Sequence, residues 1–259
     1  MKHLPTLLSA AALVGCATVP PTDTLHQNHT IDRAESVNLA DPWENWNRKV
    51  FAFNDRIDSA VLKPLAEGYR SAVPHPVRTG IDNVLGNLGD IGSTANQFLQ
   101  GKVQDGVEMG MRVLVNTIFG LGGVLDVATE ARLTRRSEDF GQTLGHWGVG
   151  SGPFVVLPLL GPSSLRDAVA LPVDLQYAPS ALAQTSAGRY SITALSVINA
   201  RSNLLSTTQL LDTAALDRYS FMRDAWLQRR LDQVYDGAPP EEKREDEPAS
   251  TSQPPEQSR

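Results

Sequence analysis

Residues 139–167 read DFGQTLGHWGVGSGPFVVLPLLGPSSLRD, and this stretch divides the chain. It holds six glycines and three prolines, and each costs a helix interior about 1 kcal/mol (glycine) or about 3 kcal/mol (proline) relative to alanine. The stretch therefore cannot be one helix, although residues 154–160 are almost wholly apolar. Irregular backbone normally runs over the surface in water, so an apolar loop must lie against protein or lipid. We expect a glycine-hinged, apolar, irregular loop between two helical halves.

The N-terminus has the features of a lipoprotein signal. Lys2 precedes a short apolar run at residues 4–14, which is too short to span a bilayer. The run ends in LVGC at residues 13–16, which is similar to a bacterial lipobox, and Cys16 is the only cysteine in the chain. We interpret Cys16 as the acylated first residue of the mature protein; the alternative is an ordinary cleaved signal with an incidental cysteine. By analogy with lipoprotein sorting, Ala17 in place of an aspartate favours the outer membrane.

Composition predicts four segments: a signal at 1–16, a flexible tether at 17–40, a helical domain at 41–236 and a disordered tail at 237–259. The tether is polar and aperiodic, and the tail is rich in proline and charge. The formal net charge of −6 argues against nucleic acid as a partner. No mature segment has 18 uncharged apolar residues in a row, so we expect no transmembrane span.

The folded domain is predicted to begin with a helix for which Asp41 is the N-cap. Apolar residues follow at spacings of three and four, which is one face of a helix. This face either packs into the core or lies in a membrane leaflet, where tryptophan is well suited to the interface. The candidate membrane-facing residues are Trp43, Trp46, Val50 and Phe53.

Two more amphipathic helices are predicted at residues 77–98 and 102–119. The first carries Gly86, Gly89 and Gly92, a stripe that favours close approach of another helix or of lipid. The second has a broad apolar face and a narrow polar stripe, which is either its solvated face or the polar lining of a channel through the protein. The residues of the stripe are Asp105, Glu108, Arg112 and Asn116.

Gly148, Gly150 and Gly152 alternate directly before Pro153 and the apolar run. Glycine adopts positive φ without steric cost, so these three residues are candidates for a hinge. Such a hinge beside an apolar segment suits a gate; a static turn that needs glycine is the alternative. Helices are again expected after this stretch, beginning near SLRD at residues 164–167 and ending before Pro239.

The sequence lacks the motifs of nucleophile-elbow hydrolases, zinc proteases, P-loop proteins and dinucleotide-binding enzymes. An acyl hydrolase that uses Ser151 or Ser163 with His146 is a weak alternative, because no acid can be assigned to orient the histidine. We therefore predict no catalytic residues, no metal and no cofactor.

Four stretches resemble the VacJ-like lipoproteins, the maintenance-of-lipid-asymmetry A family, and they occur in the family's order. They are DPWENWNRKVFAFND (41–55), NQFLQGKVQDGVEMGMRVLVNTIFGLGGVLDVA (96–128), TLGHWGVGSGPFVVLPLLGPSSLRD (143–167) and DRYSFMRDAWLQRR (217–230). The resemblance implies an all-α, ring- or doughnut-shaped domain in the inner leaflet of the outer membrane, with a central amphipathic passage.

The same resemblance implies retrograde phospholipid transport without a covalent step. Misplaced phospholipid leaves the outer leaflet through the passage and reaches a soluble periplasmic carrier, and a trimeric porin is the expected outer-membrane partner. A structural envelope lipoprotein without transport is the alternative function.

Overall fold

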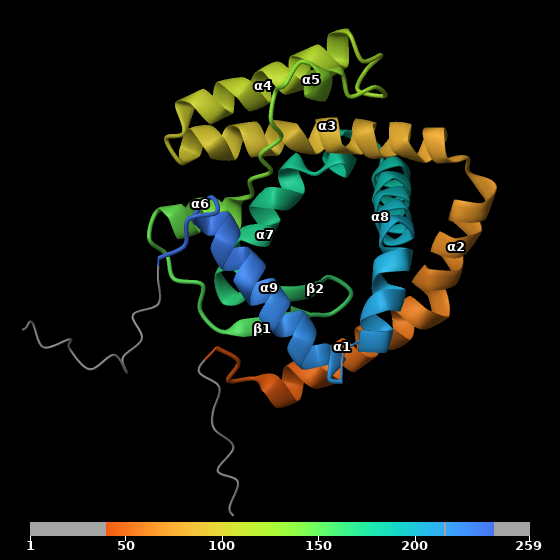
Figure 1. Cartoon of the computed structure of the whole chain (residues 1–259), viewed down its shortest axis with the longest axis vertical. Coiled ribbons are helices and arrows are strands. Elements are labelled where there is room, and N and C mark those ends of the chain that lie inside the picture. Colours follow the sequence, from red (N-terminus) through yellow and green to blue (C-terminus); the bar gives the residue numbers. More distant parts are fainter. Residues whose placement is uncertain (1–39, 215, 241–259) are drawn as a thin grey trace, which may run out of the picture. The chain divides into compact units, whose positions relative to one another are not determined.

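The computed structural model describes residues 40–214 and 216–240, so the predicted anchor Cys16 lies outside the described residues. The chain divides into the units Met1–Ser36 and Val37–Arg259, and the second unit contains every helix and strand described below. None of its described helices is both long and apolar enough to cross a membrane. In chain order the elements are α1 Glu44–Ile57, the π-helical turn η1 Asp58–Leu62, α2 Lys63–Ala72, α3 His75–Leu99, α4 Val103–Ile118, α5 Val127–Glu130, α6 Phe140–His146, β1 Phe154–Leu157, β2 Gly161–Ser164, α7 Leu165–Tyr177, the 3₁₀ turn η2 Pro179–Leu182, α8 Ser186–Ala214 and α9 Arg218–Val234 (Figure 1).

The prediction of an all-α fold is confirmed except for one short hairpin. Strands β1 and β2 pair antiparallel, with Phe154 opposite Ser164 and Leu157 opposite Gly161. Alternate residues of β1 point into the hydrophobic core, where Phe154 and Val156 pack with Tyr219. The prediction of an irregular loop is therefore wrong for this segment. The apolar run lies against protein because an alternating strand buries one side chain in two.

Two asparagines of α1 hold the free edge of β1. The Asn47 amide donates to the Phe154 carbonyl at 3.0 Å, and its oxygen accepts from the Val156 N–H at 2.9 Å. Two helical turns later, the Asn54 amide donates to the Leu157 carbonyl at 2.9 Å. Buried backbone groups need partners, and these side chains supply what a third strand would give. The polar face of α1 is consequently the face that meets the protein.

Asp41 does not cap α1, and the N-cap position belongs to Trp43. The Asp41 carboxylate is instead buried, where it accepts a hydrogen bond from the Asn47 amide at 2.8 Å and another from the Tyr219 hydroxyl. An aspartate followed by proline gives the same local sequence pattern whether it caps a helix or is buried as Asp41 is. What differs is the distant partner from α9, which local spacing does not reveal.

Helix α3 packs against four other helices of the unit. It packs along α4 on one side and contacts α6, α7 and α8 on the other (Figure 1). Two of its glycines have close neighbours, one on α7 and one in the loop before α6. A Cβ at Gly92 would lie 3.0 Å from Tyr177 of α7, and one at Gly86 would lie 2.7 Å from the Arg135 guanidinium. The predicted close approach of another helix is thus confirmed at Gly92; Gly86 is instead approached by a loop arginine, and Gly89 faces open space.

Candidate functional site

Helix α4 has the reverse of the burial pattern of an ordinary surface helix. Its polar stripe faces the protein, and its apolar residues face outward: Arg112 is 2% exposed, whereas Leu114 is 54% exposed. An amphipathic helix of a water-soluble domain normally buries the apolar stripe. The outward apolar residues of α4 are Val103, Val107, Met111, Leu114 and Ile118.

The buried half of the stripe is hydrogen-bonded to the segment that follows α4, and among its side-chain nitrogens and oxygens only the Arg112 Nε lacks a partner in the described chain. The Arg112 guanidinium pairs with Asp126 at 3.0 Å and donates to the Thr129 hydroxyl at 3.1 Å. The Asn116 amide donates to the same Asp126 carboxylate at 3.0 Å, while its oxygen accepts from the Ala128 N–H. Neither prediction for this stripe holds at these two residues. Arg112 and Asn116 are neither solvated nor channel-lining, because they bind α5 and its N-cap.

The other two residues of the stripe are partly exposed and form ion pairs with one arginine. Arg136 lies 3.2 Å from Asp105 and 2.9 Å from Glu108. Hydrogen bonds from Arg136 and from the Thr134 N–H hold the pKa of Glu108 below its usual value. The role of Asp105 and Glu108 as channel lining stays a prediction, although both already have a partner within the chain.

The outward apolar surface continues beyond the end of α4. The turn that follows carries four more exposed large apolar residues, and Leu121 has a φ of +56°, which is uncommon for a residue with a side chain. Contiguous exposed apolar surface of this kind marks contact with a membrane or another protein. The residues of the turn are Phe119, Leu121, Val124 and Leu125.

Helix α1 follows the same inverted pattern. Trp43, Trp46 and Phe53 are exposed, so the interpretation of this face as core packing is wrong for them. Val50 is different, because it is buried in the cluster with Phe154. The prediction that Val50 faces the membrane is therefore wrong: one turn of α1 packs against the hairpin and takes Val50 with it.

A cavity of about 590 Å³ lies between α3 and α8, and its lining is almost wholly apolar. Ligand pockets commonly measure about 300–1,000 Å³. A Cβ at Gly80 would lie 3.1 Å from Val124, so the glycine lets the loop close on the cavity. The lining residues are Pro76, Val77, Gly80, Ile81, Val84, Leu85 and Leu88 of α3, Val124, and Ile192 and Leu195 of α8.

The sequence pattern predicts only one of the two walls of this cavity. The spacing of Val77, Ile81, Val84 and Leu88 predicts the apolar face of a helix, and that face is the wall contributed by α3. The opposite wall comes from residues more than a hundred positions later. No local signal distinguishes an apolar face that lines a cavity from one that packs solidly.

The three candidate hinge glycines differ in conformation. Gly148 and Gly152 have φ values of +90° and +68°, whereas Gly150 has no positive φ. Gly148 follows the end of α6, where its N–H bonds to the Gly145 carbonyl at 2.9 Å, as at many helix C-termini. Gly148 and Gly150 face open space. The hinge itself stays a prediction.

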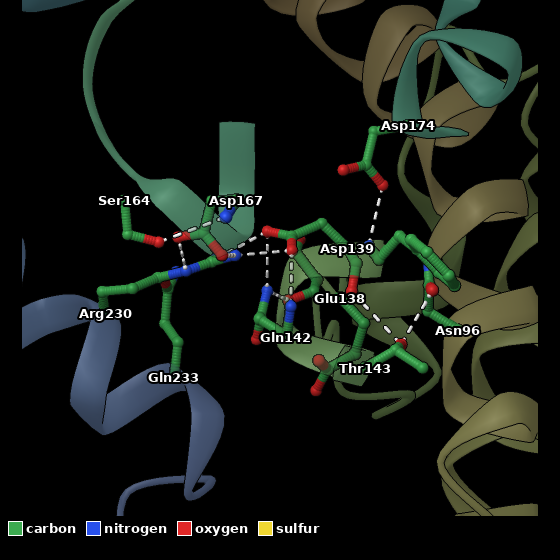
Figure 2. Close-up of polar contacts among 12 residues, drawn as sticks. Asn96, Glu138, Asp139, Gln142, Thr143, Ser164, Asp167, Asp174, Arg230 and Gln233 are labelled. Carbon is green, nitrogen blue, oxygen red and sulfur yellow. Dashed lines mark hydrogen bonds and ion pairs between the residues drawn. The ribbon is translucent and has the colours of Figure 1, made fainter. Parts of the chain in front are cut away.

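Next to these glycines, Arg230 of α9 joins α6 to α7. Figure 2 shows its guanidinium between the carboxylates of Asp139 and Asp167, and all three of its nitrogens donate hydrogen bonds to them. The N–O distances are 2.7 Å to Asp139 and 2.8 Å to Asp167. Burial raises the pKa of Asp139, but the hydrogen bonds from Arg230 and Gln142 outweigh it and hold that pKa below its usual value.

This junction also requires a glycine. A Cβ at Gly141 would lie 2.4 Å from an Asp167 oxygen and 2.6 Å from an Arg230 nitrogen, so any side chain there would displace this ion pair. On the other side of α6, the Thr143 hydroxyl donates to the Asn96 amide oxygen of α3 at 2.8 Å (Figure 2). Helix α6 is therefore fixed to three other helices by polar contacts.

The serine–histidine alternative finds no support in the geometry of the described residues. His146 is exposed, Ser163 is buried, and the Ser163 hydroxyl donates to the Ser164 carbonyl at 3.3 Å. Neither Ser163 nor Ser151 is hydrogen-bonded to His146. A nucleophile needs a base within hydrogen-bond reach.

A model of the MlaA lipoprotein family matches residues 39–233. The chain is 35% identical over 228 residues to the intermembrane phospholipid transport system lipoprotein MlaA of Escherichia coli, covering 86% of this chain and 84% of that one. It is 32% identical over 239 residues to the protein of the same name from Haemophilus influenzae, covering 90% of each. A solved chain from work on the maintenance of bacterial outer-membrane lipid asymmetry superposes with a TM-score of 0.64 at 38% identity, covering 75% of this chain and 98% of that chain.

These matches place the chain in a class of helical envelope lipoproteins whose characterised relatives are named for phospholipid transport. The chain belongs to the MlaA lipoprotein family. The resemblance drawn from the four sequence stretches is thereby confirmed.

Proposed function

We propose that this chain is an outer-membrane lipoprotein that removes misplaced phospholipid from the outer leaflet and passes it to a soluble periplasmic carrier. The observation that carries the proposal is the apolar cavity between α3 and α8. It offers acyl chains a protein environment with almost no polar surface, and burial of each CH₂ there contributes about 0.8 kcal/mol. The names of the relatives support the same function.

The inverted polarity of α1 and α4 supports a position within a lipid leaflet. Exposed apolar side chains lose nothing when lipid replaces water around them, and most of the polar side chains beneath them are already hydrogen-bonded within the protein. We propose that this face lies in the inner leaflet of the outer membrane, that acylated Cys16 anchors the chain there, and that a trimeric porin is its partner. Intact-mass analysis tests the anchor: an unacylated mature N-terminus in the wild type contradicts it.

Transport of an intact lipid needs no covalent chemistry, so we propose that the protein is not an enzyme. Phospholipid recovered unchanged after incubation with the purified chain supports this, and released fatty acid contradicts it. A purely structural envelope lipoprotein is the remaining alternative, and it predicts a chain without bound lipid.

The cavity can be tested by filling it. The full chain is extracted from membranes in mild detergent, and native mass spectrometry measures the bound phospholipid. Val84→Trp and Leu88→Trp place an indole in the cavity and should lower the bound lipid several-fold. Val103→Trp is the matched control, because Val103 lies exposed on α4, away from the cavity.

Wild-type chain without phospholipid contradicts the proposed function. Equal lipid in the wild type and in folded cavity variants contradicts the role of the cavity. Thermal melting of each variant separates lost binding from lost structure.

A further inference from the structure

A second pocket, of about 250 Å³, lies where α1, η1, the hairpin, α8 and α9 meet. One part of its wall is apolar and includes Phe51, Val156 and Leu204. The rest of the wall includes five charged residues and several uncharged polar ones. This mixture differs from the cavity between α3 and α8, which has almost no polar surface.

Two of the three cations that line this pocket are paired within the chain. Arg201 binds Asp58 through two nitrogens, at 2.7 and 2.8 Å. Arg218 lies 3.0 Å from Asp55. All four of these residues line the pocket, so their charges cancel.

Lys63 is the third cation, and it has no ion pair with any described residue. It is the first residue of α2 and is only partly exposed. The three cations and two carboxylates leave the wall with one positive charge in excess. A partly buried ammonium loses hydration, and an anion beside it restores favourable electrostatics.

We infer that this pocket binds the phosphodiester of a glycerophospholipid headgroup, with Lys63 as its anchor. A phosphodiester carries one negative charge, which matches the excess charge of the wall. The apolar part of the wall suits the glycerol and the first acyl carbons, which free phosphate lacks. This assignment rests on the proposed function, because it names a contact for the same transported lipid.

Lys49 supplies a matched control for the lysine itself. It lies on α1, it is exposed, and it does not line the pocket. Replacing either lysine by methionine removes one charge and keeps the aliphatic stem. Because Lys63 has no carboxylate partner in the described chain, Lys63→Met should fold as the wild type does. Thermal melting checks this, and Lys63→Arg keeps the charge as a second folded variant.

The test measures binding of dihexanoylphosphatidylethanolamine and of inorganic phosphate to the full chain by calorimetry. Loss of a charged hydrogen bond of about 1.5 kcal/mol weakens binding roughly tenfold. We expect this loss for the short-chain lipid with Lys63→Met, no change with Lys49→Met, and near wild-type binding with Lys63→Arg.

Three outcomes overturn the inference. Unchanged lipid binding by Lys63→Met removes Lys63 as the anchor, while lipid lost on filling the α3–α8 cavity would still uphold the proposed function. Inorganic phosphate that binds as tightly as the lipid makes this a phosphate site only. Wild-type chain that binds no lipid at all refutes the proposed function together with the inference.

Discussion

The hydroxyl of Tyr219 donates a hydrogen bond to the buried carboxylate of Asp41, joining residues 178 positions apart. The Asp41 side chain has no exposed surface, and Arg223 lies 3.5 Å from it on the side of α9. The Tyr219 ring also packs at 5.7 Å from Phe51 and 6.4 Å from Phe154. The first residues of the folded body and its last helix thus share one buried polar contact inside an aromatic cluster.

Tyr219→Phe should lower the free energy of unfolding by about 1–3 kcal/mol, because it leaves a buried carboxylate one donor short while keeping the ring in place. Urea denaturation followed by tryptophan fluorescence measures the change. Tyr190→Phe is the control, since Tyr190 is 76% exposed. Equal losses in the two variants would mean that the hydroxyl of Tyr219 contributes nothing specific.

Arg230→Met should destabilise the protein more strongly, by about 3–5 kcal/mol, because Asp139 and Asp167 lose their shared partner. Arg229→Met removes a neighbouring exposed arginine and should change stability by less than about 0.5 kcal/mol. Thermal melting of the two variants under identical conditions provides the comparison. A stable Arg230→Met protein would contradict the junction drawn in Figure 2.

Asp126 predicts an acid-sensitive contribution to stability. Burial raises its pKa, but hydrogen bonds from Thr129, Asn116 and Arg112 outweigh this and lower it from 3.8 to about 2. Because the folded-state pKa lies below the unfolded one, the contribution is present above about pH 4 and is lost as the pH falls toward about 2.

The side chain of Asp126 is one-third exposed, so the contribution is on the order of 1 kcal/mol. Asp126→Asn should remove that part of the pH dependence, measured as urea midpoints between pH 5 and 2. Glu130→Gln, an exposed carboxylate on the adjacent α5, should keep the wild-type profile. Parallel profiles for all three proteins would contradict this assignment.

The outward face of α4 should be dispensable for folding in solution and required for membrane association. Val107→Glu with Leu114→Glu, both at exposed positions, should leave the melting temperature nearly unchanged and abolish liposome flotation of a Cys16→Ala chain. Gln104→Glu adds a similar charge at an exposed polar position of the same helix and should float normally. If the double variant unfolds, the face is part of a core; if it floats, the face is not the membrane contact.

Gly150→Ala separates the gate from the static turn. A Cβ at Gly150 meets nothing within 4 Å and φ is not positive there, so alanine should leave stability unchanged or raise it by about 0.4–1 kcal/mol. Gly152→Ala is instead strained, by about 1–2 kcal/mol, because φ is +68°. Under the gate hypothesis, outer-leaflet phospholipid changes in cells carrying stable Gly150→Ala. Normal lipid asymmetry in those cells contradicts the gate.

The helices were predictable from the sequence, but their orientation was not. The spacing of Val103, Val107 and Met111 predicts a helix of amphipathic character whichever face meets the protein. Only the contacts of Arg112 with Asp126 reveal that the polar stripe is the inner one. A pattern records which residues share a face, and it does not record whether water or lipid surrounds the helix.

Long-range contacts explain the other differences between prediction and structure. Asn47 has the position of a solvated helix residue, yet its amide completes the edge of β1, more than a hundred residues away. The hairpin is too short and too rich in glycine and proline to give a clear strand pattern. The start of α6, by contrast, is set by a local contact, because the Asp139 side chain accepts a hydrogen bond from the Gln142 N–H at 2.8 Å.

The placement of Tyr219 and Arg230 on the last helix has a consequence for folding kinetics. The contacts of Tyr219 with Asp41 and of Arg230 with Asp139 join residues 178 and 91 positions apart. Such separations slow folding, because the entropy of closing a long loop is lost before the contact contributes stabilising free energy. During synthesis, the carboxylates of Asp41, Asp139 and Asp167 await their partners until α9 has emerged. In a chain that ends before Arg218, Asp41 and Asp139 lack these two contacts, so the connection between the first residues of the folded body and its last helix can form only at the end of synthesis.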